Sequence, residues 1–251
     1  MIRVEHIYKG FDGVTVLKDI TTDYEAGKCN MIIGRSGSGK TVLLKNLIGL
    51  LEPDRGEIFY GDQKLSAMTY DEKKALRQKI GILFQGSALF DFATVIENVM
   101  FPMDFFTDWT RAQKIERARF CLNRVNVINS DSKYPNELSG GMQKRVGIAR
   151  AIALNPSYLF CDEPNSGLDP YTSILIDQLI SELTREYGMT TVVNTHDMNS
   201  ILEIGDKINF IHQGTLLWQG DKTSILSTDC HELRDFLCAN TLARNIIEGK
   251  R

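Results

Sequence analysis

The feature that most constrains the fold is a glycine-rich loop, Gly34 to Thr41, which reads G-R-S-G-S-G-K-T. The pattern G-x-x-x-x-G-K-[ST] crowds backbone N–H groups around anionic oxygens, while its lysine reaches terminal phosphates. Such a loop requires a buried strand before it and a helix after it. The apolar run Asn30–Ile33 precedes it, and Lys40–Leu51 follows with helical periodicity and stops before Pro53. The sequence therefore predicts a strand–loop–helix unit that binds phosphate.

Short apolar segments alternate with helical ones along the rest of the chain. Residues 2–24 have the alternation of two strands, with a turn near Phe11-Asp12-Gly13. Three further strands end just before polar residues: Gly81–Phe84 before Gln85, Tyr158–Cys161 before Asp162 and Glu163, and Thr190–Asn194 before His196. Strands alternating with helices indicate an α/β fold with a mostly parallel sheet, whose functional residues lie at the carboxyl ends of the strands.

Composition narrows the class of protein. The 251 residues are 43% hydrophobic and 24% charged, as in ordinary globular proteins, and the net charge of -3 gives no case for nucleic-acid binding. The sequence lacks a signal-peptide pattern and a long apolar run. We therefore expect a cytoplasmic protein without direct membrane insertion. The five cysteines show no C-x-x-C spacing, which favours reduced, mostly buried thiols over a zinc site.

The stretch from about Phe92 to Ala153 is predicted to be largely helical. Arg111–Arg150 is rich in Lys and Arg, and we interpret it as a solvated helical face rather than a nucleic-acid patch. Ile80–Thr110 has no Lys or Arg, and its large apolar side chains suit either the core or a docking groove for a partner's helix. These side chains are Phe90, Phe92, Met100, Phe101, Met103, Phe105, Phe106 and Trp109.

Near-helical spacing of apolar residues predicts a terminal amphipathic helix within His231–Arg251, either folded back on its own domain or contacting a partner. The residues are Leu233, Phe236, Leu237, Leu242, Ile246 and Ile247.

Carboxylates and a histidine suggest the chemistry. Asp162 is expected to anchor the Mg²⁺ that Thr41 binds directly, and the Gln85 amide can reach the same metal or a water. Glu163 is assigned as general base or water-orienting group, and His196 can donate to a γ-phosphate oxygen. The alternatives are a pair of surface carboxylates and a polar loop histidine; the apolar strands before them favour the functional interpretation.

A second glycine loop, Leu138-Ser139-Gly140-Gly141-Met142, offers more unhindered amides but no lysine. Both glycine-rich loops can bind phosphate through their backbone amides, but only the first has a lysine. This suggests that the nucleotide is shared between two copies of the chain.

Together these residues resemble the nucleotide-binding subunit of ATP-binding-cassette (ABC) transporters over about residues 2–225. The resemblance implies that Phe11, 23 residues before Gly34, stacks on adenine, that Lys40, Glu163 and His196 are catalytic, and that Thr41, Gln85 and Asp162 bind the metal. Met142 stands where Gln is commoner in the family, and Asn165 where Thr is more frequent. The residues expected to bind ATP are Phe11, Gly34, Arg35, Ser36, Gly37, Ser38, Gly39, Lys40, Thr41, Gln85, Ser139, Gly140, Gly141 and Asp162.

The same resemblance implies a P-loop fold with an N-terminal antiparallel β subdomain and an inserted helical subdomain at about 92–153. It implies a nucleotide-binding domain at 1–225 and a C-terminal helical extension at 226–251. Two copies would sandwich two ATP molecules beneath a pair of integral-membrane permease subunits. The protein would then lie peripherally on the cytoplasmic side of the inner membrane.

Three segments, residues 83–91, 139–147 and 162–170, more narrowly resemble the ATPase of MCE-associated (Mla-type) lipid transporters. Membership there implies phospholipid-type transport, with an MCE-domain substrate-binding protein and, in some members, a STAS-domain subunit. One alternative is an ABC transporter ATPase for another substrate, such as an amino acid or a metal chelate. Another is a soluble ABC-type ATPase acting on DNA or ribosomes, which generally carries insertions or tandem cassettes that this sequence lacks.

Overall fold

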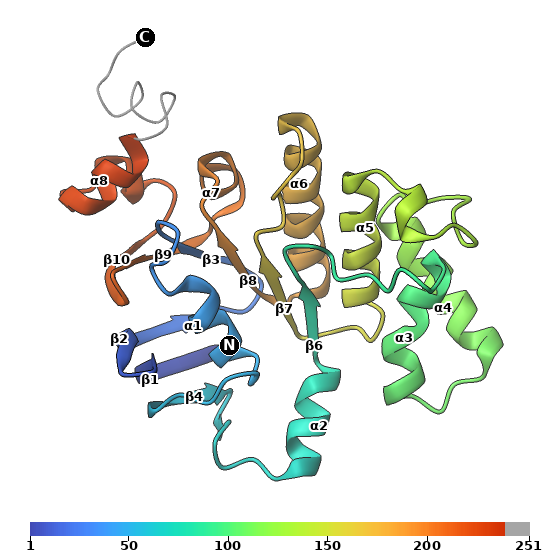
Figure 1. Cartoon of the computed structure of the whole chain (residues 1–251), viewed down its shortest axis with the longest axis horizontal. Coiled ribbons are helices and arrows are strands. Elements are labelled where there is room, and N and C mark those ends of the chain that lie inside the picture. Colours follow the sequence, from blue (N-terminus) through green and yellow to red (C-terminus); the bar gives the residue numbers. More distant parts are fainter. Residues whose placement is uncertain (239–251) are drawn as a thin grey trace.

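The computed structural model describes residues 1–238, which form two β-sheets flanked by helices (Figure 1). The first sheet is antiparallel, in the order β2-β1-β4-β5. Its strands are β1 (Ile2–Phe11), β2 (Val14–Tyr24), β4 (Arg55–Tyr60) and β5 (Gln63–Lys64). The turn between β1 and β2 at Asp12 and Gly13, both with positive φ, lies where the sequence predicted it.

The second sheet has six strands in the order β10-β9-β3-β8-β7-β6, and only β10 is antiparallel to its neighbour. Its strands are β3 (Cys29–Ile33), β6 (Ile80–Leu83), β7 (Tyr158–Asp162), β8 (Thr190–Thr195), β9 (Lys207–His212) and β10 (Thr215–Gly220). The predicted α/β class with a mostly parallel sheet is confirmed. β3 and β8 are buried along their whole length, as expected for strands covered on both faces.

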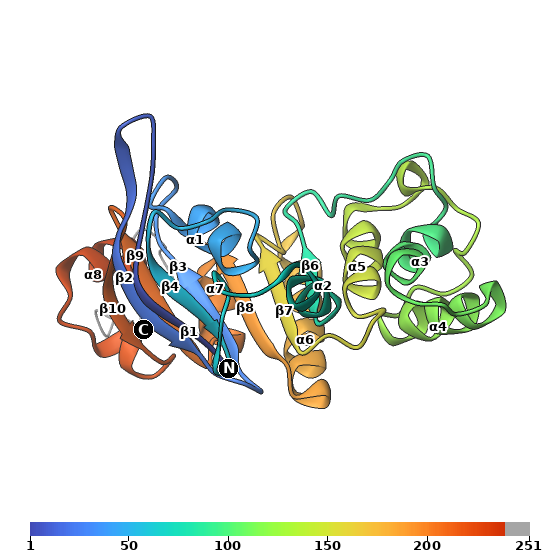
Figure 2. The same cartoon turned by 90° about the horizontal axis from the view of Figure 1, so that it is seen from below.

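Alternate residues of the parallel strands enter two different cores, because successive side chains of a strand point to opposite faces. Ile32 and Val192 pack with α1 (Lys40–Leu47) against the antiparallel sheet. Met31 and Val193 pack on the other face with α6 (Pro170–Tyr187) and α7 (Met198–Ile204). Helix α1 contacts β2 of the antiparallel sheet and β7 and β8 of the parallel sheet, which places it between the two layers (Figures 1 and 2).

Helix α1 ends earlier than the sequence analysis predicted, at Leu47 rather than Leu51. Gly49 adopts a left-handed conformation (φ 71°), its N–H donates to the carbonyl of Asn46, and the N–H of Leu50 donates to the carbonyl of Lys45. This pair of bonds satisfies the last carbonyls and terminates the helix. The apolar side chains beyond Gly49 therefore belong to the following loop.

The predicted helical stretch contains three helices that pack on one another, α3 (Val95–Phe106), α4 (Arg111–Arg124) and α5 (Gly140–Ala151). Thr94 and Thr110 begin α3 and α4 with capping boxes, and Ser139 caps α5. Met100 and Met103 are buried in the core, so those two side chains are packing residues and do not line a groove. Helix α2 (Tyr70–Gln78) precedes β6 at the edge of the sheet.

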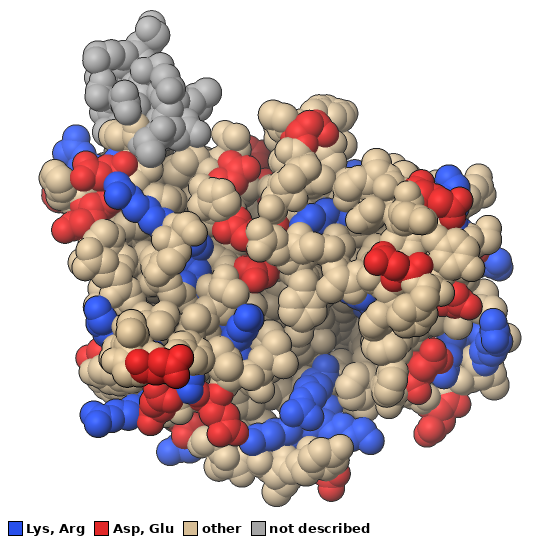
Figure 3. All heavy atoms as spheres, in the orientation of Figure 1, with Lys and Arg blue, Asp and Glu red and all other residues tan. Residues whose placement is uncertain are grey.

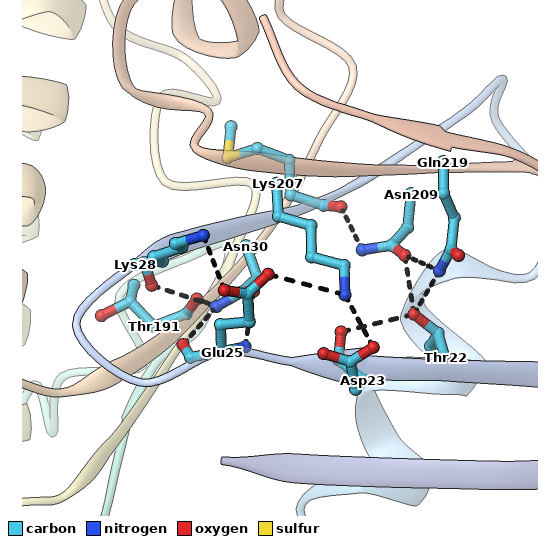
Figure 4. A network of polar contacts seen from close by, with 10 residues as sticks. Thr22, Asp23, Glu25, Lys28, Asn30, Thr191, Lys207, Asn209 and Gln219 are labelled. Atoms are coloured by element: carbon cyan, nitrogen blue, oxygen red, sulfur yellow. Dashed lines mark hydrogen bonds and ion pairs between the residues drawn. The ribbon is translucent and has the colours of Figure 1, made fainter.

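A polar network joins the two sheets at the end away from the glycine loop (Figure 4). Lys207 on β9 forms an ion pair with Asp23 on β2 at 2.8 Å. The Thr22 hydroxyl donates to Asn209 Oδ1 at 2.8 Å, and the buried Asn30 amide donates to the carbonyl of Thr191. Because buried polar groups are costly unless paired, the contacts of β2 with Lys207 and Asn209 fix how the sheets meet, and the Asn30 bond ties β3 to β8 within the parallel sheet.

The chain continues from β10 to α8 (His231–Cys238), which folds back on its own domain, the first of the two alternatives for this helix. Leu233 and Leu237 are fully buried in the core beneath the parallel sheet, and the Phe236 ring lies 5.6 Å from that of Phe210 on β9. Leu242, Ile246 and Ile247 of the predicted terminal helix lie outside the described residues. None of the helices within residues 1–238 has both the length and the apolar character that crossing a membrane requires.

Candidate active site

The glycine loop leaves β3 and enters α1 at the carboxyl edge of the parallel sheet. Gly34 has φ 151°, and a Cβ there would lie 2.2 Å from the carbonyl oxygen of Ile211 on β9, so only glycine fits. The Lys40 side chain is buried and folds back over the loop, donating to the carbonyl oxygens of Gly34 (2.8 Å) and Arg35 (3.2 Å). Burial lowers the pKa of Lys40, and the charges of Glu163 and Asp162 oppose that shift.

A cavity of about 940 Å³ opens beside this loop. Its wall brings together side chains that the sequence predicted for the site, from four different parts of the chain. They are Arg35, Ser36, Lys40, Thr41, Gln85, Glu163 and His196. This volume is of the size that binds a small molecule in proteins.

Thr41 and Asp162 are connected through a third residue. The buried Asn194 on β8 donates from its amide to the Thr41 hydroxyl (3.2 Å) and to Asp162 Oδ1. β8 lies between β3 and β7, so its polar side chain reaches both neighbours at the same edge. A hydroxyl and a carboxylate are thereby held close together beneath the cavity.

Glu163 and His196 form the second pair. His196 Nδ1 lies 2.9 Å from Glu163 Oε1, and the carboxylate is mostly buried while the imidazole is exposed. Glu163 has φ 48°, in the left-handed region, and its N–H donates to the carbonyl of Asn194 at 2.8 Å. This backbone conformation turns the chain at the strand end, so that Asp162 and Glu163 face different partners.

Gln85, two residues after the end of β6, also lines the cavity. Its amide Nε2 contacts the hydroxyl of Ser166 at 3.4 Å, three residues beyond Glu163. The predicted site residues at the ends of β3, β6, β7 and β8 are therefore assembled at one edge of the sheet.

Seven predicted residues do not line this cavity. Gly34 and Ser38 belong to the glycine loop and Asp162 ends β7, whereas the other four lie elsewhere. Phe11 borders a separate shallow hollow at the β1–β2 turn, with the Lys9 ammonium 5.5 Å from its ring centroid. Ser139, Gly140 and Gly141 lie at the start of α5, and both views place α5 across β6 and β7 from α1 (Figures 1 and 2). Within one chain, the second glycine loop thus does not meet the first.

The sequence analysis missed Asn194 as a site residue and assigned it only to a strand. Its signal was weak: a single amide in a strand of Thr and Val residues that precedes His196. The cavity wall also includes Val16 on β2 and Phe236 on α8. No local pattern marks these two residues, because their position depends on how distant elements pack.

Comparison with known proteins agrees with this geometry. The family described as "ABC transporter" matches residues 17–166. The chain is 36% identical to the methionine import ATP-binding protein MetN of Carboxydothermus hydrogenoformans, over 98% of this chain and 73% of that protein. It is 34% identical to the probable ribonucleotide transport ATP-binding protein mkl of Mycobacterium leprae, over 94% of this chain and 68% of that protein.

Solved structures show the same fold. The ATP-binding cassette MJ0796, determined as a dimer in a post-hydrolysis state bound to ADP and Pi, superposes with a TM-score of 0.80 at 32% identity. That alignment covers 88% of this chain and 99% of MJ0796. CbiO1 from Clostridium perfringens, part of an ABC transporter complex, superposes with a TM-score of 0.83 at 28% identity, over 98% of both chains. The chain therefore belongs to the ABC transporter family, as an ATP-binding subunit that hydrolyses ATP.

Proposed function

We propose that two copies of this chain bind ATP at the seam between them and power the transport of a phospholipid-type molecule. The observation that carries the proposal is the assembly of Lys40, Thr41, Glu163 and His196 around one cavity, with Ser139 and its glycines outside it. A head-to-tail dimer would bring Ser139 and Gly141 of one copy onto the γ-phosphate in the other. MJ0796, determined as a dimer, supports this arrangement.

In this proposal each residue of the pocket has a separate role. Lys40 exchanges its bonds with the carbonyls of Gly34 and Arg35 for bonds to the β- and γ-phosphates. The amides of residues 34–39 surround the phosphates, and the Phe11 ring packs on adenine once the nucleotide is bound.

The proposal also divides the chain into a nucleotide-binding domain at 1–225 and a C-terminal helical extension at 226–251.

The donor set fits a magnesium ion. Thr41 offers a hydroxyl and Asp162 a carboxylate, and Asn194 bridges the two. The Gln85 amide adds a carbonyl oxygen. Such oxygen atoms are the hard ligands that Mg²⁺ prefers. No cluster of three or more His, Cys, Asp or Glu side chains competes for another metal within residues 1–238. When bound, the ion would neutralise charge that develops on the phosphate oxygens.

In this proposal Glu163 acts in the hydrolytic step. A water in line with the γ-phosphorus would give a proton to the Glu163 carboxylate as its oxygen bonds to phosphorus, and the bond to the ADP oxygen breaks. His196 holds Oε1 of Glu163, which leaves Oε2 for the water. Loss of the γ-phosphate removes the bridge between the copies, so the dimer reopens.

A groove lined by residues of β6, α3 and the loop between them is the proposed permease contact. Its volume is about 390 Å³, and its wall is largely apolar, with Ile82 from β6, Phe84 and Phe90 from the following loop, and Phe101 and Pro102 from α3. In Figure 3, Lys and Arg side chains gather over α2. They lie beside a hollow, and the surface next to that hollow is mostly uncharged. A cytoplasmic helix of a permease subunit, apolar with acidic flanks, suits this surface.

The lipid substrate rests on the resemblance of residues 83–91, 139–147 and 162–170 to Mla-type ATPases. In such a system the permease pair would work with an MCE-domain protein, and a STAS-domain subunit could bind the ATPase. The chain would then lie on the cytoplasmic face of the inner membrane. A second candidate is import of a small polar molecule such as methionine, which the similarity to MetN favours.

One experiment separates the two candidates. The chain would be purified with its native membrane partners, and the bound small molecules extracted and identified by mass spectrometry. Co-purified phospholipid together with lipid-stimulated ATP hydrolysis would support the lipid proposal. Bound methionine or a methionine-binding partner, with hydrolysis indifferent to lipid, would replace it with the second candidate.

A further inference from the structure

Lys144 is a buried lysine that the proposed reaction does not use. It lies on α5, five residues after the Ser139 cap, and only 4% of the residue is exposed. Within residues 1–238, no Asp or Glu side chain forms an ion pair with it. Its ammonium instead donates to two main-chain carbonyl oxygens, those of Gln85 and of Glu163, the latter at 3.4 Å.

Burying an ammonium without a carboxylate partner is costly, because neutral carbonyls replace only part of its hydration. Burial accordingly lowers the pKa of Lys144, and the nearby acidic groups of Cys161, Glu163 and Asp162 oppose that shift. A methionine of similar length would fill the same space without the cost. The presence of a lysine here therefore points to a role other than stability.

The two carbonyls belong to segments with unfavourable backbone conformations. Glu163 has φ 48°, and Ser87 and Ala88, just after Gln85, have φ 61° and 46°. Left-handed conformations of residues with a Cβ persist only where the surroundings hold them. Lys144 provides one such contact at each segment.

Helix α5 holds the second segment at another point as well. The Arg150 guanidinium donates to the carbonyls of Ser87 (2.6 Å) and Ala88 (2.7 Å), and its Cζ lies 5.8 Å from the ring centroid of Phe90 in the apolar groove. One helix thus touches the groove through Arg150, and the backbones of Gln85 and Glu163 through Lys144. The start of the same helix carries Ser139.

We propose that Lys144 is a positioning residue for ATP hydrolysis, whose ammonium sets the backbones of Glu163 and Gln85 relative to α5. The inference rests on the proposed roles of Glu163 and Gln85. When a second copy's nucleotide engages Ser139 and draws α5 toward it, Lys144 moves the main chain of Glu163 with the helix. The carboxylate then reaches its water only in the closed dimer.

The test compares three variants of the full chain in steady-state hydrolysis of Mg-ATP and in thermal unfolding. Lys144→Met removes the donor and keeps the length, and Lys144→Gln keeps a shorter, neutral donor. Arg145→Met is the matched control, because the Arg145 guanidinium lies on the same helix and donates to the carbonyl of Val125 at 2.9 Å, away from the cavity.

Lys144→Met is expected to keep or raise the Tm while lowering kcat at least about tenfold, with KM for ATP changed less than about threefold. Lys144→Gln should have an intermediate kcat. Arg145→Met should show the opposite pattern, with a lower Tm and nearly native kcat.

Two outcomes would overturn the proposal: a native kcat in Lys144→Met, or a kcat that falls only in step with a lowered Tm. Glu163→Gln in the same assay separates this result from the site assignment. If Glu163→Gln abolishes hydrolysis while Lys144→Met leaves it intact, only the role of Lys144 fails. If Glu163→Gln retains hydrolysis, the assignment of Glu163 itself is wrong.

Discussion

His196 Nδ1 lies 2.9 Å from Glu163 Oε1, which joins the ends of β8 and β7 through their side chains. Each side chain alone would be a common polar residue at a strand end. Together they leave one carboxylate oxygen and one imidazole nitrogen available to a ligand in the cavity. The pair is the geometric basis for assigning acid–base and phosphate-binding roles at this edge of the sheet.

Replacing His196 by Ala tests that pair. The carboxylate of Glu163 would lose the partner that orients it, so kcat should fall by about 10- to 100-fold, while the affinity for ATP changes little. Single-turnover hydrolysis and nucleotide titration measure the two quantities separately. Asn199→Ala, at an exposed position three residues further along, serves as control. A variant that hydrolyses ATP at the native rate would remove His196 from the site.

Replacing Lys40 by Ala removes the cation that the loop holds over its own carbonyls. ATP hydrolysis should be abolished, because no other ammonium among the described residues lines the cavity to meet the terminal phosphates. Lys45→Ala, an exposed lysine on the same helix, should hydrolyse ATP normally. Near-normal turnover by Lys40→Ala would contradict the assignment of the phosphate site.

Charged substitutions at Phe101 and Phe105 test the proposed permease groove. The two ring centroids lie 4.8 Å apart, and both side chains are exposed on α3. The double variant Phe101→Asp and Phe105→Asp should therefore spare the fold and weaken permease binding. Phe120→Asp, at an exposed aromatic on α4, is the control. Co-purification with the permease and transport-coupled hydrolysis are the measurements; if both survive in the double variant, the groove is not the docking surface.

The buried carboxyl group of Asp177 makes the stability of the fold depend on pH. Burial raises its pKa from 3.8 to about 6, the charges of Asp197 and Glu203 add to that shift, and hydrogen bonding from Ser200 and Asn165 opposes it. The folded chain therefore binds this proton more tightly than the unfolded chain. Its contribution to stability is fully present below the unfolded pKa and is lost as the pH rises through about 6.

Asp177→Asn removes this dependence. The free energy of unfolding of the variant minus that of the native chain should increase by about 2 kcal/mol between pH 4.5 and pH 8. Urea denaturation across that range measures the difference, and Asp229→Asn, at an exposed aspartate, controls for the general effect of charge. Parallel pH curves for Asp177→Asn and the native chain would show that the carboxyl titrates alike in both states.

Most of the fold was predictable from local signals. The glycine loop requires a strand before it and a helix after it, and the short apolar runs before Gln85, Asp162 and His196 mark neighbouring strand ends. The starts of α3 and α4 were not predicted individually, although Thr94 and Thr110 begin them with capping boxes. The end of α1 was mispredicted because the apolar pattern continues past Gly49, whose left-handed conformation decides where the helix stops.

The remaining parts of the site depend on pairings between distant segments. Asn194 bonds to Thr41 across 153 positions, and this contact follows from the strand order, which the sequence does not state. Lys144 and Asp177 read as ordinary helix residues, and only their burial reveals them. Phe11 borders a hollow separate from the cavity, so its stacking on adenine stays a proposal.

The central claim is that each catalytic site combines Lys40 of one copy with Ser139 of the other. Mixing two inactive variants, Lys40→Ala and Ser139→Arg, tests it most directly, because only a shared site can reassemble one intact pocket in the mixed dimer. The account predicts that each variant alone hydrolyses almost no ATP and that the mixture regains a substantial fraction of native activity. A mixture no more active than its components would contradict it.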